Sequence, residues 1–573
     1  MRPIKAVFVL FLIFAAVGFG AYDHTAVNVN YGFGFIDSVA ATGGHGLTAA
    51  NPSLTFGCTG TLTGLKIYMR STTANACALA KLKIMSGTPG SFVLESEVSI
   101  LTQVAEVKPA AVENFILELT GLSLPVEPDH FLANCLDTSV TYAIKNPGLM
   151  TYYYGNGDTA VLGASATYDI CWEATISTSD KIIYTGSTWT AGETAHIQSY
   201  DASPFYIVVE GVQVPDTETL AFTLQYTDAT TDATATEETY TIDYSGGAGD
   251  GTVKGDAATT ASIAGQEGDK INYYIYINPA TGKQDLYFCN YTDGAGGQGD
   301  TDIKHVSLNS RGLANITAAN KLRRIGIVNA GGNATADRIV VCREPVVAGF
   351  DSYVSMGSGG VLVLGRVGAY LDDAGVFTEQ RHVINGGIPG NLVTDTTESS
   401  YTAIKTRWNS SENDLCGFRD VVYVFVNGPG LNDVASLVGE ASTDIEIDCL
   451  AYQIAGEILT MAGDVLSTKI DGVTVTSNDL VLCGMVPYTA NSGQEEINEM
   501  LCQQRVNELL EVAAYRLGVP FVDCWGLASY TDGTHYTDAG NALVAERIAT
   551  AYENNQVPNN PFGSSGSRGF NRF

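Results

Sequence analysis

The chain has 573 residues, of which 45% are hydrophobic and 16% are charged. A chain of this length is too long to fold around a single hydrophobic core, so we expect three or four globular domains. Acidic residues outnumber basic residues by 62 to 30, and the resulting net charge of −32 opposes binding to nucleic acid and to anionic membranes.

Residues 1–20 are typical of a secretory signal. Arg2 and Lys5 form a charged start, an apolar run follows, and the small residues Gly18 and Gly20 precede the predicted cleavage point. The apolar run is short for a membrane span, with a retained N-terminal anchor as the alternative. We therefore expect a secreted, periplasmic or cell-surface protein that has no membrane span after signal removal.

The chain contains eleven cysteines, and export would allow disulfides to form. Cys58 with Cys77, and Cys135 with Cys171, are candidate pairs within the first β-rich part. Cys483 lies in an apolar strand, so we expect it to be a buried thiol. The sequence has no C-x-x-C motif and no Cys/His cluster with zinc spacing, so it identifies no metal site.

Residues 21–175 are predicted to form a β-sandwich. Segments 62–70, 115–122 and 151–157 show short alternation of apolar and polar residues, with Gly, Thr and Asn between them. Such patterns indicate short strands joined by turns. This part contains no grouping of residues that suggests catalysis.

Residues 176–346 are again rich in predicted strands. The segments are 205–214, 220–228, 238–245, 271–282, 283–293, 323–332 and 336–345. The strand and turn pattern over 277–293 and 322–345 resembles laminin-G-like or concanavalin-A-like jelly rolls. That resemblance implies a binding or spacer module, often for glycans.

Several acidic residues lie in or beside the turns of this second β-rich part. They are Asp228, Asp232, Asp293, Asp300 and Asp302. Their carboxylate oxygens could hold Ca²⁺ in the β domains, and solvated turns are the alternative.

Predicted strands alternate with predicted helices over residues 347–556. Strands are expected at 345–350, 381–387, 420–428, 480–488 and 519–526, and helices at 361–375, 444–463, 495–518 and 542–552. This alternation predicts a three-layer α/β domain with a flavodoxin-like parallel sheet. Residues 557–573 are polar and rich in Gly and Ser, which predicts a flexible tail.

The active site of such a domain is expected beyond the carboxyl ends of its parallel strands. Asp532 and His535 lie in the segment that follows the last strand, with Asp532 three residues before His535. A carboxylate that orients an imidazole makes that imidazole a general base. Ser352, Gly387 and Asn432 follow three other strands. These residues supply a nucleophile, a backbone N–H and an amide, as acyl transfer requires.

Four blocks in this order resemble the SGNH hydrolases, also called the GDSL esterase/lipase family, over about residues 346–556. The blocks are Gly-Phe-Asp-Ser at 349–352, Asn-Gly-Gly-Ile-Pro-Gly at 385–390, Gly-Leu-Asn-Asp at 430–433 and Asp-Gly-Thr-His at 532–535. The resemblance implies a carboxylic ester hydrolase that requires no metal or organic cofactor.

The resemblance also implies a role for each matched residue. Ser352 would be the nucleophile, His535 the general base and Asp532 the residue that orients the imidazole. The backbone N–H groups of Ser352 and Gly387, together with the Asn432 side chain, would form the oxyanion hole.

Two features depart from the family pattern or compete with this alignment. Phe350 stands where the family usually has glycine, and phenylalanine does not readily supply a positive φ. An alternative alignment places Gly-Arg-Val at 365–367 in the first block. That alignment leaves no nucleophile and too few residues for the crossover helix before 381.

The sequence thus predicts a secreted serine esterase, with O-acetyl groups on a polysaccharide as a candidate substrate. The first alternative is an adhesion, glycan-binding or matrix protein whose SGNH-like domain is inert. A lipase or thioesterase is a further alternative, because the sequence does not show the size of the pocket. The sequence does not indicate the oligomeric state of the protein.

Overall fold

The computed structural model describes the chain over many short ranges in the N-terminal half and nearly continuous ranges after residue 415. The described residues are 22–27, 47–56, 59–71, 81–88, 91–99, 114–135, 140–142, 144–145, 151–156, 164–167, 169–170, 172–178, 182–185, 188–189, 197–199, 204–212, 219–228, 234–243, 251–254, 260–263, 270–278, 283–290, 304–307, 320–329, 334–335, 337–349, 352–358, 361–373, 375–387, 390, 392–395, 408, 415–466, 469–471, 474–476, 479–487, 491–532 and 535–559. The predicted signal, most of the predicted tail and the two predicted disulfides lie wholly or partly outside these residues.

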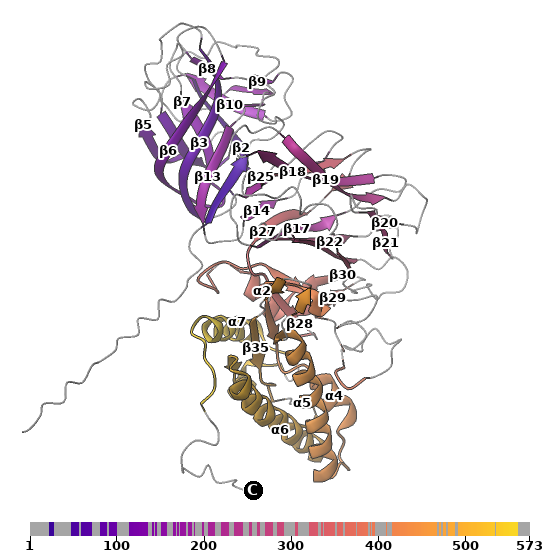
Figure 1. The fold of residues 1–573 in the computed structure, drawn as a ribbon. Helices are drawn as coiled ribbons and strands as arrows, with labels where there is room; N and C mark the ends of the chain where they lie inside the picture. Colours follow the sequence, from indigo (N-terminus) through magenta and orange to yellow (C-terminus); the bar gives the residue numbers. More distant parts are fainter. Residues whose placement is uncertain are drawn as a thin grey trace, which may run out of the picture.

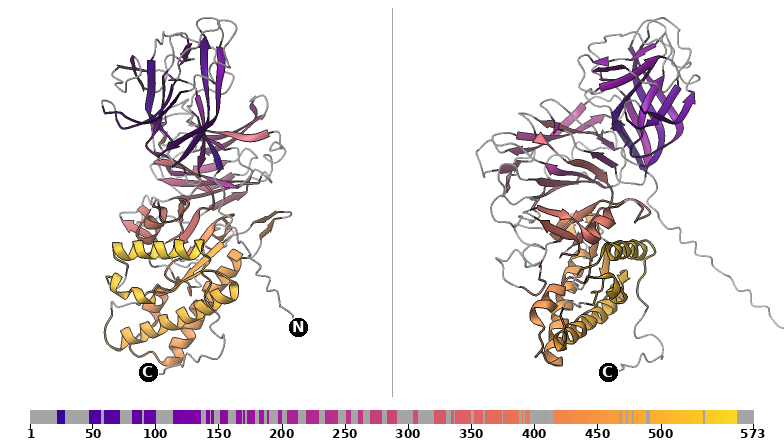
Figure 2. Two further views of the ribbon diagram at one scale, coloured as in Figure 1. Left: turned by 90° about the vertical axis from the view of Figure 1, so that its left-hand side faces the viewer. Right: turned by 180° about the vertical axis from the view of Figure 1, so that it is seen from behind.

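Two antiparallel β modules precede a mixed α/β domain, and the three parts are stacked along the molecule (Figures 1 and 2). In the first module one sheet holds β6 (Asn114–Val126), β3 (Gly60–Ser71), β13 (Trp172–Thr178) and β1 (Tyr22–Val27), with β8 (Val140–Tyr142) beside β3. The other holds β11 (Ala164–Thr167), β10 (Thr151–Asn156), β2 (Leu47–Thr55), β7 (Phe131–Cys135), β4 (Lys81–Ser86) and β5 (Val93–Ser99).

The second module also has two antiparallel sheets, and all seven strand segments expected in it contain strands. One sheet runs β14 (Ile182–Thr185), β27 (Arg338–Cys342), β17 (Phe205–Val212), β22 (Ile271–Asn278), β23 (Lys283–Asn290) and β24 (Lys304–Ser307). The other runs β21 (Thr260–Ile263), β20 (Gly251–Lys254), β19 (Thr234–Asp243), β18 (Thr219–Asp228), β25 (Asn320–Asn329) and β16 (Ile197–Ser199). Two short pairs, β9 (Ile144–Lys145) with β12 (Asp169–Ile170) and β15 (Thr188–Trp189) with β26 (Ala334–Thr335), complete the β part.

Backbone pairing links the two β modules. β1 pairs with β13 on one side and with β16 on the other, so one sheet continues from the first module into the second. β13 also runs across the predicted boundary at residue 175. The two modules are therefore joined by strand hydrogen bonds as well as by the chain.

The C-terminal part contains the predicted parallel sheet. Its strands, in spatial order, are β31 (Val383–Asn385), β28 (Val346–Gly349), β32 (Val422–Phe425), β35 (Asp479–Cys483) and β36 (Phe521–Val522). The helices are α2 (Arg366–Asp372), α4 (Leu431–Leu437), α5 (Asp444–Leu466), α6 (Gln494–Leu517) and α7 (Asp538–Glu553). None of the helices in the described part of the chain has the length and apolar character that crossing a membrane requires.

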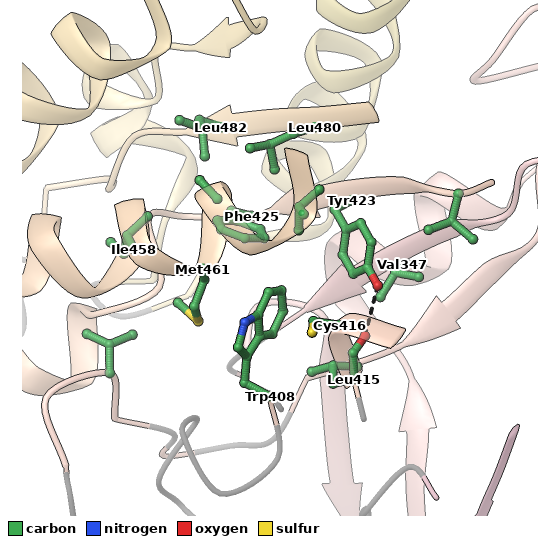
Figure 3. Close-up of a cluster of buried hydrophobic side chains, with 14 of the residues drawn as sticks. Val347, Trp408, Leu415, Cys416, Tyr423, Phe425, Ile458, Met461, Leu480 and Leu482 are labelled. Carbon is green, nitrogen blue, oxygen red and sulfur yellow. Dashed lines mark hydrogen bonds between the residues drawn. The ribbon is translucent and has the colours of Figure 1, made fainter. Parts of the chain in front are cut away.

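Both faces of the parallel sheet are buried. Along β28, Val346 and Ala348 belong to the core beneath α2 and α7, whereas Val347 belongs to the core beneath α5 and α6. Figure 3 shows the second core, in which the Tyr423 hydroxyl donates to the Leu415 carbonyl at 2.9 Å. Apolar runs in these strands thus follow from a sheet that is covered on both faces.

Local signals set the helix ends. Before α5, the Thr443 N–H donates to Glu446 at 2.8 Å while the Glu446 N–H donates to the Thr443 hydroxyl at 3.4 Å, which is a capping box. α6 ends at Gly518, whose φ of 71° is the left-handed conformation that glycine tolerates. The Thr537 side chain accepts a hydrogen bond from the Gly540 N–H and caps α7.

One predicted helix was wrong in part. Residues 361–375 were expected to be helical, but Val361–Leu364 form β30, which pairs with β29 (Ser355–Ser358) in an antiparallel hairpin. The run Val-Leu-Val-Leu has the composition of a strand, and the helix α2 begins only after Gly365. A second unpredicted hairpin, β33 (Lys469–Asp471) with β34 (Thr474–Thr476), follows α5.

The second β module and the α/β domain share one hydrophobic core. Phe418, just after the short helix η2 (Leu415–Gly417), stacks on the Tyr287 ring with the centroids 4.3 Å apart. The Tyr287 hydroxyl donates to the Gly417 carbonyl at 2.7 Å, and the Tyr206 hydroxyl donates to the Arg419 carbonyl at 2.6 Å. Side chains of this module therefore form part of the interior of the α/β domain.

Candidate active site

The predicted site residues follow the carboxyl ends of the parallel strands, as expected. Ser352 follows β28, Gly387 follows β31, and Asn432 lies in the first turn of α4, after β32. β28 lies between β31 and β32, so the chain crosses to one side of β28 and then to the other. Ligands of open α/β sheets bind at such a switch point.

The structure brings Ser352 and His535 together across 183 residues of chain. Ser352 Oγ lies 2.9 Å from His535 Nε2, and both side chains are half-buried. This hydrogen bond links a hydroxyl to the ring nitrogen that can accept its proton when the neutral imidazole carries hydrogen on Nδ1. The distance is that of a nucleophile and its general base.

A tight turn holds Asp532 beside His535. The Asp532 N–H donates to the His535 carbonyl at 2.9 Å, and Asp532 Oδ1 accepts from the His535 N–H at 2.8 Å. A bridge between Thr531 and Tyr536 closes the turn. Asp532 is exposed, so its carboxylate shapes the turn from the solvent side.

His535 has a pKa below its ordinary value. Burial is the largest cause, because it disfavours the charged imidazolium, and the positive charge of Arg366 acts in the same direction. The Asp532 carboxylate opposes both effects by raising the pKa. The imidazole is therefore held mainly in the neutral form that a general base needs near neutral pH.

Two tyrosines that the sequence did not single out lie beside the pair: Tyr353 packs against the His535 ring, and Tyr536 packs against Tyr353. The Tyr353 ring lies 5.3 Å from the His535 ring and 5.2 Å from the Tyr536 ring. The Tyr536 hydroxyl lies 3.3 Å from Asn427 Oδ1, in the loop after β32. Each tyrosine is the immediate neighbour of a predicted catalytic residue, which is the only signal that the sequence offered.

The first and second blocks meet through glycines. A Cβ on Gly349 would lie 2.5 Å from the backbone carbon of Gly386, so only glycine allows the ends of β28 and β31 to approach this closely. The next N–H, that of Gly387, donates to Asn385 Oδ1 at 2.9 Å. The predicted oxyanion donor Gly387 is thus engaged by a side chain of its own block.

The third block begins with a glycine-dependent turn. Gly430 has a φ of 146°, and a Cβ there would lie 2.6 Å from Ile454 Cγ2. Asn432 is half-buried, whereas the Asp433 carboxylate is buried and accepts from the N–H groups of Val393 and Thr394 at 2.9 and 2.8 Å. Asp433 therefore has a structural role, because it ties the third block to the loop after β31.

The competing alignment of the first block is inconsistent with the sheet. It required Val361–Leu364 to be the first parallel strand, but those residues form the hairpin with β29. β28 is the first strand of the parallel sheet in chain order, and it leads to Ser352. Phe350 and Asp351, which carry the departure from the family pattern, lie outside the described residues.

The remaining predictions concern cysteines and metals. Cys483 is buried as expected, and burial raises the pKa of its thiol well above the ordinary value. Within the described ranges, no three His, Cys, Asp or Glu side chains group closely enough to hold a metal ion. Asp228 ends β18, whereas the other four acidic residues proposed for Ca²⁺ lie outside those ranges.

His382 is buried at the seam between the second β module and the α/β domain. Its Nε2 lies 3.3 Å from Glu210 Oε1, and its Nδ1 lies 3.4 Å from Asp372 Oδ1. Arg338 bonds to both carboxylates. This buried histidine thus lies in a half-buried cluster of polar and charged side chains that joins the two parts.

Comparison with known proteins identifies no family for this chain. No family model matches the chain, and no curated protein matches it. Among solved structures, the tail fiber protein gp63.1 from a phage of E. coli matches with 10% identity and a TM-score of 0.18, over 56% of this chain and 39% of that one. Dimeric latent PorU from Porphyromonas gingivalis matches with 9% identity and a TM-score of 0.19, over 82% of this chain and 30% of that one. The matches thus span less than half the length of either protein, and at these TM-scores they assign neither fold family nor function.

Proposed function

We propose that residues 347–556 form a serine ester hydrolase of the SGNH type. The observation that carries this proposal is the 2.9 Å contact between Ser352 Oγ and His535 Nε2 at the carboxyl edge of a parallel sheet. The lowered pKa of His535 supports it, because the neutral imidazole can accept the Ser352 proton.

The proposed reaction has two halves. Ser352 Oγ attacks the acyl carbonyl while His535 Nε2 takes the hydroxyl proton, and a tetrahedral intermediate forms. His535 returns that proton to the leaving alcohol as the ester bond breaks, which leaves an acyl group on Ser352. A water molecule then attacks the acyl carbonyl and gives a proton to His535, and His535 returns that proton to Ser352 Oγ as the Oγ–acyl bond breaks and the carboxylic acid leaves.

Asp532 stabilises the imidazolium that forms in each half-reaction. Its carboxylate raises the pKa of His535, and its hydrogen bond with the His535 N–H fixes the loop that carries the ring. The protein groups named above supply the nucleophile, the base and the charge stabilisation, and the mechanism needs no metal or organic cofactor.

The oxyanion would be stabilised by the N–H groups of Ser352 and Gly387 and by the Asn432 amide. Removing one such donor typically costs about 100- to 1000-fold in rate. Gly387 can serve only if Asn385 Oδ1 releases its N–H, because that hydrogen bond is present at 2.9 Å. We therefore propose that substrate binding turns the Asn385 side chain away.

The proposed substrate is an O-acetylated polysaccharide outside the cell. The predicted signal at residues 1–20 supports an exported enzyme. The two-sheet modules support a glycan substrate, because the strand and turn pattern of the second resembles laminin-G-like or concanavalin-A-like jelly rolls. The packing of Phe418 against Tyr287 fixes the second module to the domain that carries Ser352. A glycan held by that module would therefore stay in a constant position relative to the site.

An extracellular glycan-binding protein with an inert α/β domain is the second candidate. The hydrogen bond from Gly387 to Asn385 favours it, because an oxyanion donor that stays engaged cannot stabilise a transition state. The two candidates make opposite predictions for catalysis and share the prediction of glycan binding.

The test uses the full-length protein. We expect wild type to hydrolyse p-nitrophenyl acetate and to release acetate from an O-acetylated polysaccharide, and Ser352→Ala to do neither. Ser436→Ala, an exposed serine on α4, is the matched control and should retain full activity. Glycan binding by full-length Ser352→Ala without hydrolysis by wild type would support the second candidate instead.

A further inference from the structure

Residues 365–367 form hydrogen bonds to the backbone of the turn that carries Ser352. The carbonyls of residues 352–354 each accept a hydrogen bond from that segment, and the β29–β30 hairpin makes the connection between them. The bonds run from the Gly365 N–H to the Val354 carbonyl at 3.0 Å, from the Val367 N–H to the Tyr353 carbonyl at 3.1 Å, and from Arg366 Nη1 to the Ser352 carbonyl.

Arg366 differs from the other two donors because it uses its side chain. It is the first residue of α2, it is half-buried, and its φ of 50° lies in the left-handed region. Residues other than glycine, asparagine and aspartate rarely adopt this conformation, and where they do it often marks a functional constraint. Here the guanidinium bonds directly to the residue that carries the nucleophile.

The Arg366 guanidinium also affects the charge of His535, the second residue of the Ser352–His535 pair. Arg366 from α2 and Asp532 from the histidine loop are the charged groups that act on His535, and the Tyr353 ring packs against the imidazole. Arg366 disfavours the imidazolium, whereas Asp532 favours it. One side chain thus contacts the Ser352 backbone and also influences the charge of its base.

We propose that Arg366 is a positioning residue of the Ser352–His535 pair, and that it holds the Ser352 turn so that the hydroxyl points at His535 Nε2. This inference rests on the proposed esterase function. It also assigns a role to the Gly-Arg-Val segment at 365–367, which braces the nucleophile turn of the first block.

Three variants of the full-length protein test this role. Arg366→Met removes both the charge and the donor, and Arg366→Lys keeps the charge but not the geometry of the guanidinium. Arg505→Met is the matched control, because Arg505 Nη1 also donates to a backbone carbonyl, that of Asp444 at 3.1 Å, on the α5–α6 side of the domain. The measurements are kcat/KM against pH and an NMR titration of His535.

We expect Arg366→Met to lower kcat/KM by about 10- to 100-fold, the size of loss that misplacing a reacting group by about 1 Å causes. Its acid limb should move to higher pH, because loss of the cation lets the pKa of His535 rise. Arg366→Lys should restore the pH profile but only part of the rate. Arg505→Met should match wild type in both readouts.

The inference is wrong if Arg366→Met keeps both the wild-type rate and the wild-type titration of His535. A stability loss with an unchanged pH profile would show a merely structural role and would also overturn it. If wild type proves inactive, the proposed function fails separately. The NMR titration still decides the inference then, because an unchanged His535 resonance and pKa in Arg366→Met would contradict a contact that positions the pair.

Discussion

Two histidines of the α/β domain lie close to carboxylates, but their surroundings differ. His382 is completely buried between Glu210 and Asp372, at the seam with the second β module. His535 is half-buried at the carboxyl edge of the sheet, with Asp532 in its own turn and Ser352 Oγ at 2.9 Å. The seam holds its histidine away from solvent, whereas the edge presents its histidine to a hydroxyl.

The comparison shows that a histidine next to a carboxylate does not by itself indicate catalysis. His382 contacts two carboxylates and Arg338 bridges them, so that cluster holds two parts of the molecule together. Access and a nucleophile distinguish His535. The seam and the edge should therefore respond differently to the same substitution.

The largest expected effect separates the two histidines by activity. His535→Ala should lower kcat/KM for p-nitrophenyl acetate by about 10⁴-fold or more, because it removes the general base. His382→Ala should stay within about threefold of wild type, since the seam does not touch the reacting groups. Equal losses in the two variants would remove the distinction on which the comparison rests.

The same pair should reverse its order in stability. His382→Ala removes a completely buried ring and leaves a cavity at the seam, a large-to-small change that costs about 3 kcal/mol. His535→Ala removes only a half-buried ring and should lower the free energy of unfolding by no more than about 1 kcal/mol. Calorimetric unfolding of both variants measures this, and a His382→Ala protein as stable as wild type would contradict the seam's role.

A smaller effect is expected where the first two blocks touch. Gly349→Ala places a Cβ 2.5 Å from the Gly386 backbone, and overpacking of this kind costs about 2 kcal/mol. Gly456→Ala on α5 is the control, because its Cβ meets nothing within 4 Å and alanine favours a helix. We expect Gly349→Ala to lower both stability and kcat, and Gly456→Ala to lower neither.

The smallest effect concerns pH. Because burial and Arg366 lower the pKa of His535, the neutral base persists below its ordinary pKa of about 6.5. The acid limb of kcat/KM should therefore lie below pH 6.5, with activity rising as pH increases through the His535 pKa. An acid limb clearly above that value would mean that Asp532 outweighs burial.

Strand ends made much of the site predictable. Alternation of strands and helices predicts a parallel sheet, and a parallel sheet gathers the residues after its strands on one edge. Ser352 and His535 could therefore be placed together although they are far apart in sequence. Three of the predicted helices and all five strands of this domain were found, which follows from their strong periodicity and glycine punctuation.

The remaining features depended on contacts that no local pattern encodes. The segment 361–364 is a short apolar run, which is compatible with either a helix or a strand. Only its pairing with β29 shows that it is a strand. Arg366 reaches back to the Ser352 carbonyl across a hairpin that the sequence did not predict. The insertion of Phe418 among the tyrosines of the second module likewise requires the two parts to be docked.

Catalysis by this domain requires Ser352 to be an activated nucleophile. Reaction of the full-length protein with a fluorophosphonate probe, followed by peptide mapping, tests it most directly. We expect covalent labelling at Ser352 in wild type, and loss of labelling in both Ser352→Ala and His535→Ala. Unlabelled wild type, or labelling that persists at another serine in Ser352→Ala, would contradict it.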